Sequence, residues 1–90
     1  MGKEIRLFKS EERKSREEVS NFLRQLADRI SDGTVVLSQG TEELTLELPQ
    51  QLVLEVEAED KMKGAKGVQH NLEIEIKWFD NEPEGPLQLK

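Results

Sequence analysis

The chain has no cysteine and only one histidine among its 90 residues. Without thiols it forms no disulfide, has no thiol nucleophile and offers no thiolate to zinc or to an iron–sulfur cluster. His70 cannot form a Cys–His pair, and no Gly-x-Ser-x-Gly turn accompanies it for serine catalysis. We therefore expect no enzymatic activity, no cofactor and no metal centre, with His70 a solvated loop residue.

Long apolar runs are missing as well. No run approaches the ~18 residues that a membrane span requires, and residues 1–14 are charged throughout, without the apolar core of a signal peptide. The net charge is −6, from 19 acidic and 13 basic residues. This balance opposes nonspecific binding to nucleic acid, because neutralising phosphates needs a basic face. The composition predicts a cytoplasmic protein that does not enter a membrane.

The length suits one domain with one modest core. Residues 1–79 carry the patterned sequence, and we expect them to form a single α+β domain. Residues 80–90 are acidic and contain two prolines, a composition typical of a flexible tail.

One stretch has a clear helical pattern. Its apolar residues recur at offsets 0, 3, 4, 7 and 11, which forms one stripe along a helix: Val19, Phe22, Leu23, Leu26 and Ile30. Ser15 and Glu18 have the spacing of a capping box at a helix start, and Gly33 suits the left-handed residue that follows a helix. The sequence predicts a helix over about residues 16–31.

Several other stretches alternate apolar and polar residues with the period of a strand. Residues 4–8 predict a short first strand. Pro49 ends a later one, because it has no N–H to donate to a ladder. Residues 61–70, which contain glycine and lysine, are predicted to be a loop. The four strands expected after the helix cover residues 34–38, 43–48, 52–60 and 71–79.

These elements have the order β-α-β-β-β-β. Consecutive strands with short links favour an antiparallel meander. The apolar sheet face and the helix stripe can bury each other. We therefore expect a two-layer α+β fold, with one amphipathic helix packed on one face of a mostly antiparallel sheet.

Trp78 is the one tryptophan of the chain. In the last expected strand it shares a face with Leu72, Ile74 and Ile76. We expect its indole to be mostly buried against the helix stripe, near Phe22 or Leu26. The alternative is an exposed anchor for a binding partner.

The other face of the expected sheet is acidic. Its glutamates lie in phase on two strands that we expect to be neighbours, and Lys77 and Arg6 are the cations available to balance them. Like charges directly opposite each other destabilise a sheet, so such a face needs an explanation. Solubility and protection against edge-to-edge aggregation would suffice; the alternative is a surface for a cation or a basic protein. The residues of this candidate partner-binding surface are Glu55, Glu57, Glu59, Glu73 and Glu75.

A second candidate surface is basic. The sequence GAKG at residues 64–67 has the GxxG form that clamps a nucleic-acid backbone in some domains, and Lys61, Lys63 and Lys66 lie in or beside it. Residues 9–16 hold a further basic cluster: Lys9, Arg13, Lys14 and Arg16. Contact with phosphate or nucleic acid through these residues is the alternative to protein binding. A soluble hairpin tip is the plain explanation of the lysines.

Three segments together resemble the amphi-Trp domain family: REEVSNFLRQLADRISDG, LPQQLVLEVEAED and LEIEIKW. That family is named for a closing amphipathic strand that ends in tryptophan, and the resemblance covers about residues 4–79. It implies the fold and points to no reactive group. The positions that carry it are Gly33, Pro49, Glu55, Glu57, Glu73, Glu75 and Trp78.

The sequence thus predicts a small non-enzymatic interaction module, either a monomer or a weak homodimer. It would bind a protein partner through the acidic face or through an exposed strand edge.

Overall fold

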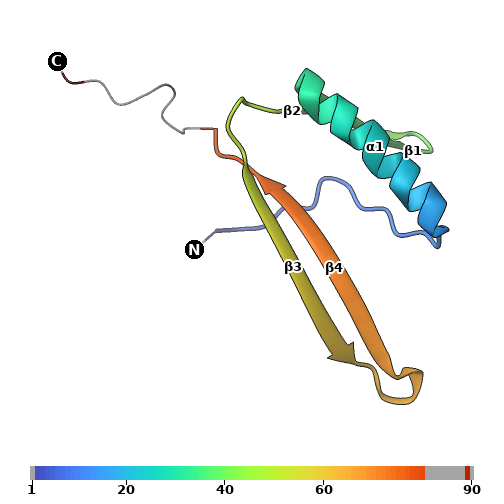
Figure 1. The fold of residues 1–90 in the computed structure, drawn as a ribbon. Helices are drawn as coiled ribbons and strands as arrows, with labels where there is room; N and C mark the ends of the chain where they lie inside the picture. The colour runs from blue at the N-terminus through green and yellow to red at the C-terminus, as the bar shows by residue number, and fades with distance from the viewer. Residues whose placement is uncertain (1, 81–88, 90) are drawn as a thin grey trace. The chain divides into compact units, whose positions relative to one another are not determined.

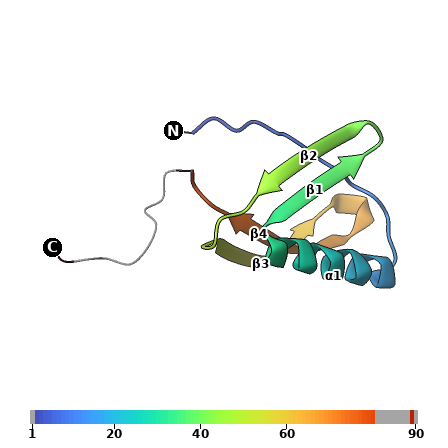
Figure 2. The ribbon, with the colours of Figure 1, turned by 90° about the horizontal axis from the view of Figure 1, so that it is seen from above.

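A computed structural model describes residues 2–80 and residue 89. In this part of the chain one helix precedes four strands: α1 (Arg16–Asp32), β1 (Thr34–Gln39), β2 (Glu42–Glu47), β3 (Val53–Met62) and β4 (Val68–Lys77). The strands form two antiparallel pairs, β1 with β2 and β3 with β4 (Figures 1 and 2). This arrangement confirms the predicted α+β class.

The chain divides into two compact units, which we call the helical unit (Met1–Gln50) and the hairpin unit (Gln51–Lys90). A single domain over residues 1–79 stays a prediction. The expected tail falls mostly on residues 81–88 and 90, which lie outside the described residues.

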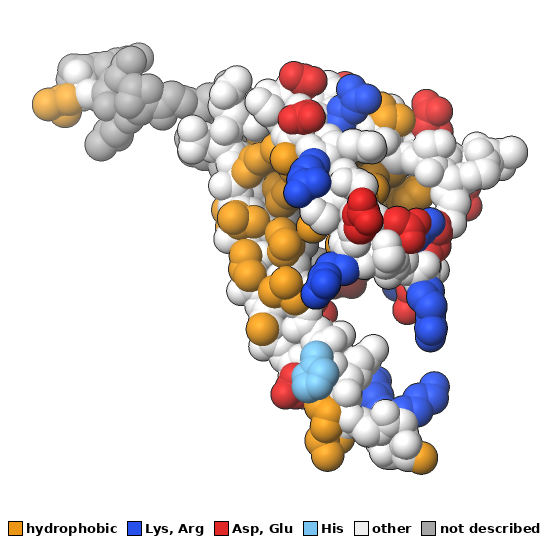
Figure 3. Space-filling model, turned by 45° about the vertical axis from the view of Figure 1, so that its right-hand side comes forward, with side chains coloured by type: hydrophobic (Ala, Val, Ile, Leu, Met, Phe, Trp, Pro, Cys, Tyr) orange, Lys and Arg blue, Asp and Glu red, His pale blue; other side chains and the backbone are white. Residues whose placement is uncertain are grey.

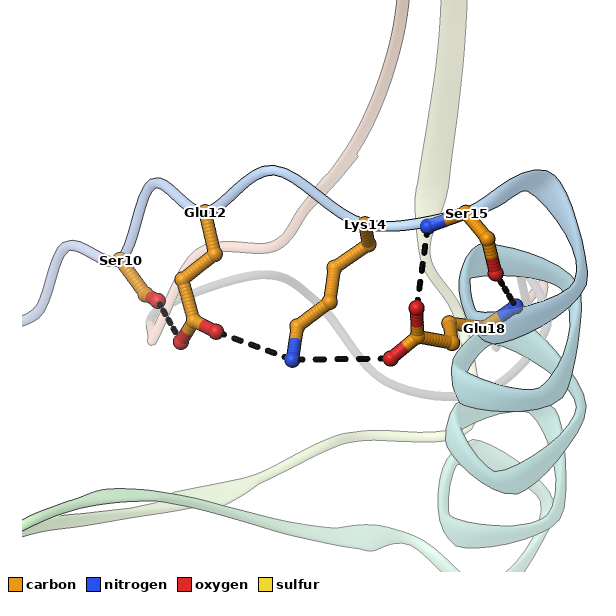
Figure 4. A network of polar contacts seen from close by, with 5 residues as sticks. All are labelled: Ser10, Glu12, Lys14, Ser15 and Glu18. Atoms are coloured by element: carbon orange, nitrogen blue, oxygen red, sulfur yellow. Dashed lines mark hydrogen bonds and ion pairs between the residues drawn. The ribbon is translucent and has the colours of Figure 1, made fainter.

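The start of α1 is set by the predicted capping box. The Glu18 backbone N–H donates to the Ser15 hydroxyl at 3.0 Å, and the Ser15 N–H donates to the Glu18 carboxylate at 3.1 Å. Lys14 lies between the carboxylates of Glu12 and Glu18, at 3.1 and 3.8 Å (Figure 4). The two hydrogen bonds between Ser15 and Glu18 satisfy backbone donors at the start of the helix.

Gly33 ends α1 and begins the turn into β1. Its φ is +92°, in the left-handed region, and its N–H donates to the carbonyls of Arg29 and Ile30. Its own carbonyl accepts a hydrogen bond of 2.8 Å from the Leu48 N–H, directly before Pro49. The left-handed conformation of Gly33 after the helix confirms the prediction from the sequence. Its hydrogen bond with Leu48 also connects the end of α1 to the end of β2.

The β1–β2 hairpin supplies the core of the helical unit. Gln39 pairs with Glu42 across a two-residue loop in which Gly40 has a φ of +59°, as in a type II′ turn. Val35, opposite Leu46, is 5% exposed and is the one buried hydrophobic residue among those described. The core is accordingly small.

The helix stripe is only partly covered. Leu26 and Ile30, in the second half of α1, are half-buried, and α1 contacts β1. Val19, Phe22 and Leu23 in the first half are 46%, 55% and 44% exposed. The first half of α1 borders an open groove instead of packing fully on the strand.

The β3–β4 hairpin has the strand phase that the sequence predicts. Val56 lies opposite Ile74 and Glu57 lies opposite Glu73, so apolar and acidic residues separate onto two faces. The turn between the strands contains a one-turn 3-10 helix, η1 (Gly64–Lys66). Gly64, its first residue, and Gly67, directly after it, have φ angles of +59° and +86°.

Three expectations about the elements were wrong. Residues 4–8 form no strand, because alternation permits a strand but does not supply a neighbour for it. The four later strands form two separate hairpins, with no pairing between β2 and β3. The expected loop 61–70 is shorter, because β3 runs to Met62 and β4 begins at Val68. His70 therefore lies in a strand.

Candidate functional site

The β3–β4 register brings the predicted acidic residues together on one face of the hairpin, here called the acidic face. Glu55 lies opposite Glu75, and Glu57 lies opposite Glu73. Glu59, two residues further along β3, lies opposite Asn71. All five glutamates are exposed. The predicted cluster is thus formed by two neighbouring strands.

Lys77 partly balances this face. Its Nζ lies 2.8 Å from Glu55 Oε1, and both side chains are partly exposed. The hydrogen bond and the charge of Glu55 raise the pKa of Lys77. Glu55 is therefore the paired member of the acidic face.

Three other carboxylates lie close to one another without such a pair. Oxygen atoms of Glu57, Glu59 and Glu73 all fall within 4.8 Å of one another. Carboxylate oxygens of this kind are ligands for hard cations such as Ca²⁺ and Mg²⁺, although full exposure weakens such a site. Their crowding makes this the most negative part of the face.

The opposite face of the hairpin, here called the apolar face, is hydrophobic and largely uncovered. Leu54 and Leu72 are 66% and 71% exposed, and Val56 and Ile74 are 60% and 54% exposed. In Figure 3 hydrophobic side chains line the hairpin, and some also lie beyond the pale-blue histidine. Its members are Leu54, Val56, Ala58, Leu72, Ile74 and Ile76.

Trp78 follows the last residue of β4 and is half-buried. This is less burial than its phase in the strand predicts. Phe79, next to it, is exposed. The indole thus remains partly available to a partner.

His70 lies on the same side of the hairpin as the apolar face, between Leu72 and Val68. Its Nδ1 lies 2.7 Å from Asp60 Oδ1, its cross-strand neighbour, and both side chains are mostly exposed. No serine lies in β3, in β4 or in the turn between them. This pair can link the two strands, and it resembles no nucleophilic triad.

The residues predicted for phosphate contact lie in two different parts of the chain. Lys61 is in β3, and Lys63 and Lys66 belong to the turn, where the N–H groups of Lys63, Lys66 and Gly67 already donate to carbonyls. The cluster over residues 9–16 belongs to the helical unit, and there Glu12 and Glu18 hold Lys14. The hydrogen bond with Glu12 has the largest effect in raising the pKa of Lys14, and the charges of Glu12 and Glu18 raise it further.

The helical unit contains a groove of about 730 Å³ beside the first half of α1. Phe8, Val19, Phe22 and Leu37 give it an apolar wall, and Glu12, Lys14 and Glu18 lie on its polar side. Because Lys14 contacts both carboxylates, the groove offers no unpaired acid for catalysis among its described residues. Sequence reasoning missed this groove, since nothing in the sequence shows that β1 covers only part of the stripe.

No helix in the described part of the chain is long and apolar enough to cross a membrane. Comparisons with curated proteins and with solved structures gave no match. A family model described as the Amphi-Trp domain matches residues 1–90, the full length of the chain. The chain therefore belongs to the Amphi-Trp domain family.

Proposed function

We propose that this protein is a non-enzymatic cytoplasmic interaction module whose acidic face binds a basic segment of a protein partner. The observation that carries the proposal is the direct opposition of Glu57 and Glu73, with Glu59 close to both. Like charges placed opposite each other cost about 0.2–1 kcal/mol per pair. A basic segment would relieve this repulsion, so binding gains energy that the free protein lacks.

The hairpin also supports the proposal through its uncovered surface. A two-stranded hairpin is at best marginally stable by itself, and both of its faces are largely exposed. A partner that bound the folded hairpin would stabilise it by mass action. An extended partner could pair with a strand edge while its basic side chains reach the acidic face.

The test compares the affinity of a fluorescently labelled lysine-rich peptide for matched variants, by fluorescence anisotropy. The double variant Glu57→Gln with Glu73→Gln should bind several-fold more weakly than the wild type. Glu42→Gln with Glu43→Gln changes the net charge equally, but these residues lie in β2. Equal weakening by both double variants would mean that only net charge attracts the peptide, and would contradict the proposal.

The alternative is phosphate contact through Lys61, Lys63 and Lys66. The N–H groups that the turn uses internally disfavour a phosphate cradle there. A single-stranded oligonucleotide replaces the peptide in the same assay. Binding that Lys63→Gln with Lys66→Gln abolishes, and that falls linearly with salt on a log–log plot, would favour this alternative.

A further inference from the structure

Among the described residues, no strand pairs with the edge of β3 that faces away from β4, which leaves backbone groups free there at defined positions. The Lys63 N–H donates to the Gly67 carbonyl at 2.8 Å, one residue beyond the last ladder pair, Met62 with Val68. This bond has the direction and register of one bond of a hydrogen-bonded pair. Such pairs alternate along a ladder, so Glu57 and Glu73 form another one. The N–H and C=O groups of Val56 and Ala58 must then point away from β4. All ten residues of β3 are exposed.

Residues 3–7 have a strand-like sequence and pair with no strand in the part of the chain that the structure describes. Ile5 and Leu7 alternate with Glu4 and Arg6, and the two apolar side chains are 75% and 65% exposed. Residues 1–16 hold six basic residues against three acidic ones. The segment is therefore basic and amphipathic in the strand period, as a ligand of the acidic face needs to be.

The segment fits the β3 edge in one antiparallel register, with Arg6 opposite Glu57. Ile5 then lies opposite Ala58 and Leu7 opposite Val56, which extends the apolar face. Arg6 joins the acidic face in a non-hydrogen-bonded pair, where side chains lie closest.

The remaining two residues of the segment, Lys3 and Glu4, would also lie opposite charged residues of β3. Lys3 lies opposite Asp60, a favourable pair of charges. Glu4 lies opposite Glu59, which is the one unfavourable pair in this register. The two favourable charge pairs outnumber this one. Removing the charge of Glu4 should strengthen the association, which tests the register.

We propose that residues 3–7 of a second copy of this chain add to the outer edge of β3 as an antiparallel strand. The inference rests on the proposed role of the acidic face and names one partner for it. Each copy has both the segment and the edge, so the exchange is reciprocal and closes as a symmetric dimer. Strand addition supplies main-chain hydrogen bonds, and the alternating side chains supply the specificity.

The first test is sedimentation equilibrium of the full chain from micromolar to millimolar concentration. The wild type should dimerise, and Arg6→Glu should weaken the dimer roughly tenfold, because two cross-strand pairs become repulsive. Arg13→Glu changes the net charge equally outside the segment and should weaken it much less. Leu7→Pro removes an N–H that faces Val56 and should also weaken the dimer. Both Arg6 and Leu7 lie outside the helix and the strands, so these variants leave the regular elements intact.

The second test exchanges the charges between two copies. Arg6→Glu and Glu57→Arg should each dimerise poorly, since their homodimers oppose like charges. An equimolar mixture should form a heterodimer of near wild-type affinity, because both contacts then join opposite charges. Glu4→Gln should tighten the wild-type dimer by relieving its contact with Glu59.

Three results would overturn the inference. First, the wild type could stay monomeric at millimolar concentration. Second, Arg6→Glu could weaken the dimer no more than Arg13→Glu does. Third, the mixture of Arg6→Glu and Glu57→Arg could associate no better than either variant alone. Peptide binding separates this failure from that of the proposed function. If Arg6→Glu still binds the lysine-rich peptide through Glu57 and Glu73, the acidic face remains a binding surface although the second copy is not its partner.

Discussion

The side chains at the start of α1 show how single residues set local stability. Ser15 and Glu18 each satisfy a backbone N–H of the other, and Lys14 lies beside the same carboxylate. The hydrogen bond from the Ser15 backbone, then that of its side chain and the charge of Lys14, lower the pKa of Glu18. The ionised form of Glu18 is therefore the one that the folded helix favours.

This lowered pKa predicts a pH dependence. Because the folded pKa lies below the ordinary value of 4.5, ionised Glu18 stabilises the fold above that pH. The stabilisation is lost as pH falls through the folded pKa. Glu18→Gln should thus destabilise the protein at neutral pH and match the wild type in acid, as measured by urea unfolding at several pH values. Glu17→Gln serves as the control, and a difference for Glu18→Gln that persists unchanged in acid would contradict this explanation.

Glu57 tests whether charge repulsion exists on the acidic face. Removing its charge should relieve the contact with Glu73 and raise the free energy of unfolding by about a few tenths of a kcal/mol. Added salt should reduce the gain. Glu55→Gln should instead lower the free energy of unfolding, because it breaks the contact with Lys77. If Glu57→Gln instead destabilises the fold in urea titrations, then this carboxylate is paired and the face is charge-balanced.

Trp78 is half-buried, and this sets the expected cost of removing it. Truncating a fully buried aromatic residue costs about 3–5 kcal/mol, so we expect about 2 kcal/mol for Trp78→Ala. Circular dichroism during urea unfolding measures this cost. Phe79→Ala, at an exposed neighbouring position, should be nearly neutral. Equal costs for the two variants would show that the indole packs on nothing in the free protein.

At the scale of elements, local signals specified most of the structure. The capping box, Gly33 and the helix stripe predicted α1 to within a residue or two. Alternation predicted β1 to β4 and the common face of the five glutamates. These signals are local, because each depends on the conformation of a few consecutive residues.

Pairing between distant segments was not predictable in this way. Gly40 and the glycines around η1 provide tight turns, which specify the two hairpins. The link between β2 and β3 contains Pro49, which gives no hydrogen-bond donor, and the two strands do not pair. For residues 4–8 the alternating pattern does not show which strand the segment would pair with. Near the turn of the β3–β4 hairpin, polar residues interrupt the alternation. The sequence therefore predicted a loop over residues 61–70, although both strands extend into this range.

Gly33 gives the sharpest prediction at this scale. An alanine there would meet no closer atom than the Leu48 carbonyl oxygen at 3.9 Å, so space is available. Its φ of +92° is nevertheless strained for any residue with a Cβ. Gly33→Ala should therefore cost about 1–2 kcal/mol in thermal or urea unfolding. Gly2→Ala, without such a φ, should cost little, and a neutral Gly33→Ala would show that the turn can relax.

For the whole molecule, the net charge of −6 hides an uneven distribution. Residues 1–16 are basic on balance, whereas five glutamates occupy one face of β3–β4. A chain with both charges can bind a basic partner and can also associate with itself. Both proposals depend on the same claim, that the acidic face is a binding surface.

Amide chemical shifts during a titration with the lysine-rich peptide test that claim most directly, with magnesium and calcium as separate titrations. The Arg6→Glu variant is used beside the wild type, so that self-association does not compete. We expect the shift changes to concentrate at residues 53–59 and 73–77, and the double variant Glu57→Gln with Glu73→Gln to lose most of them. No shift change at millimolar peptide, or changes spread evenly over both units, would contradict the account and leave solubility as the role of these glutamates.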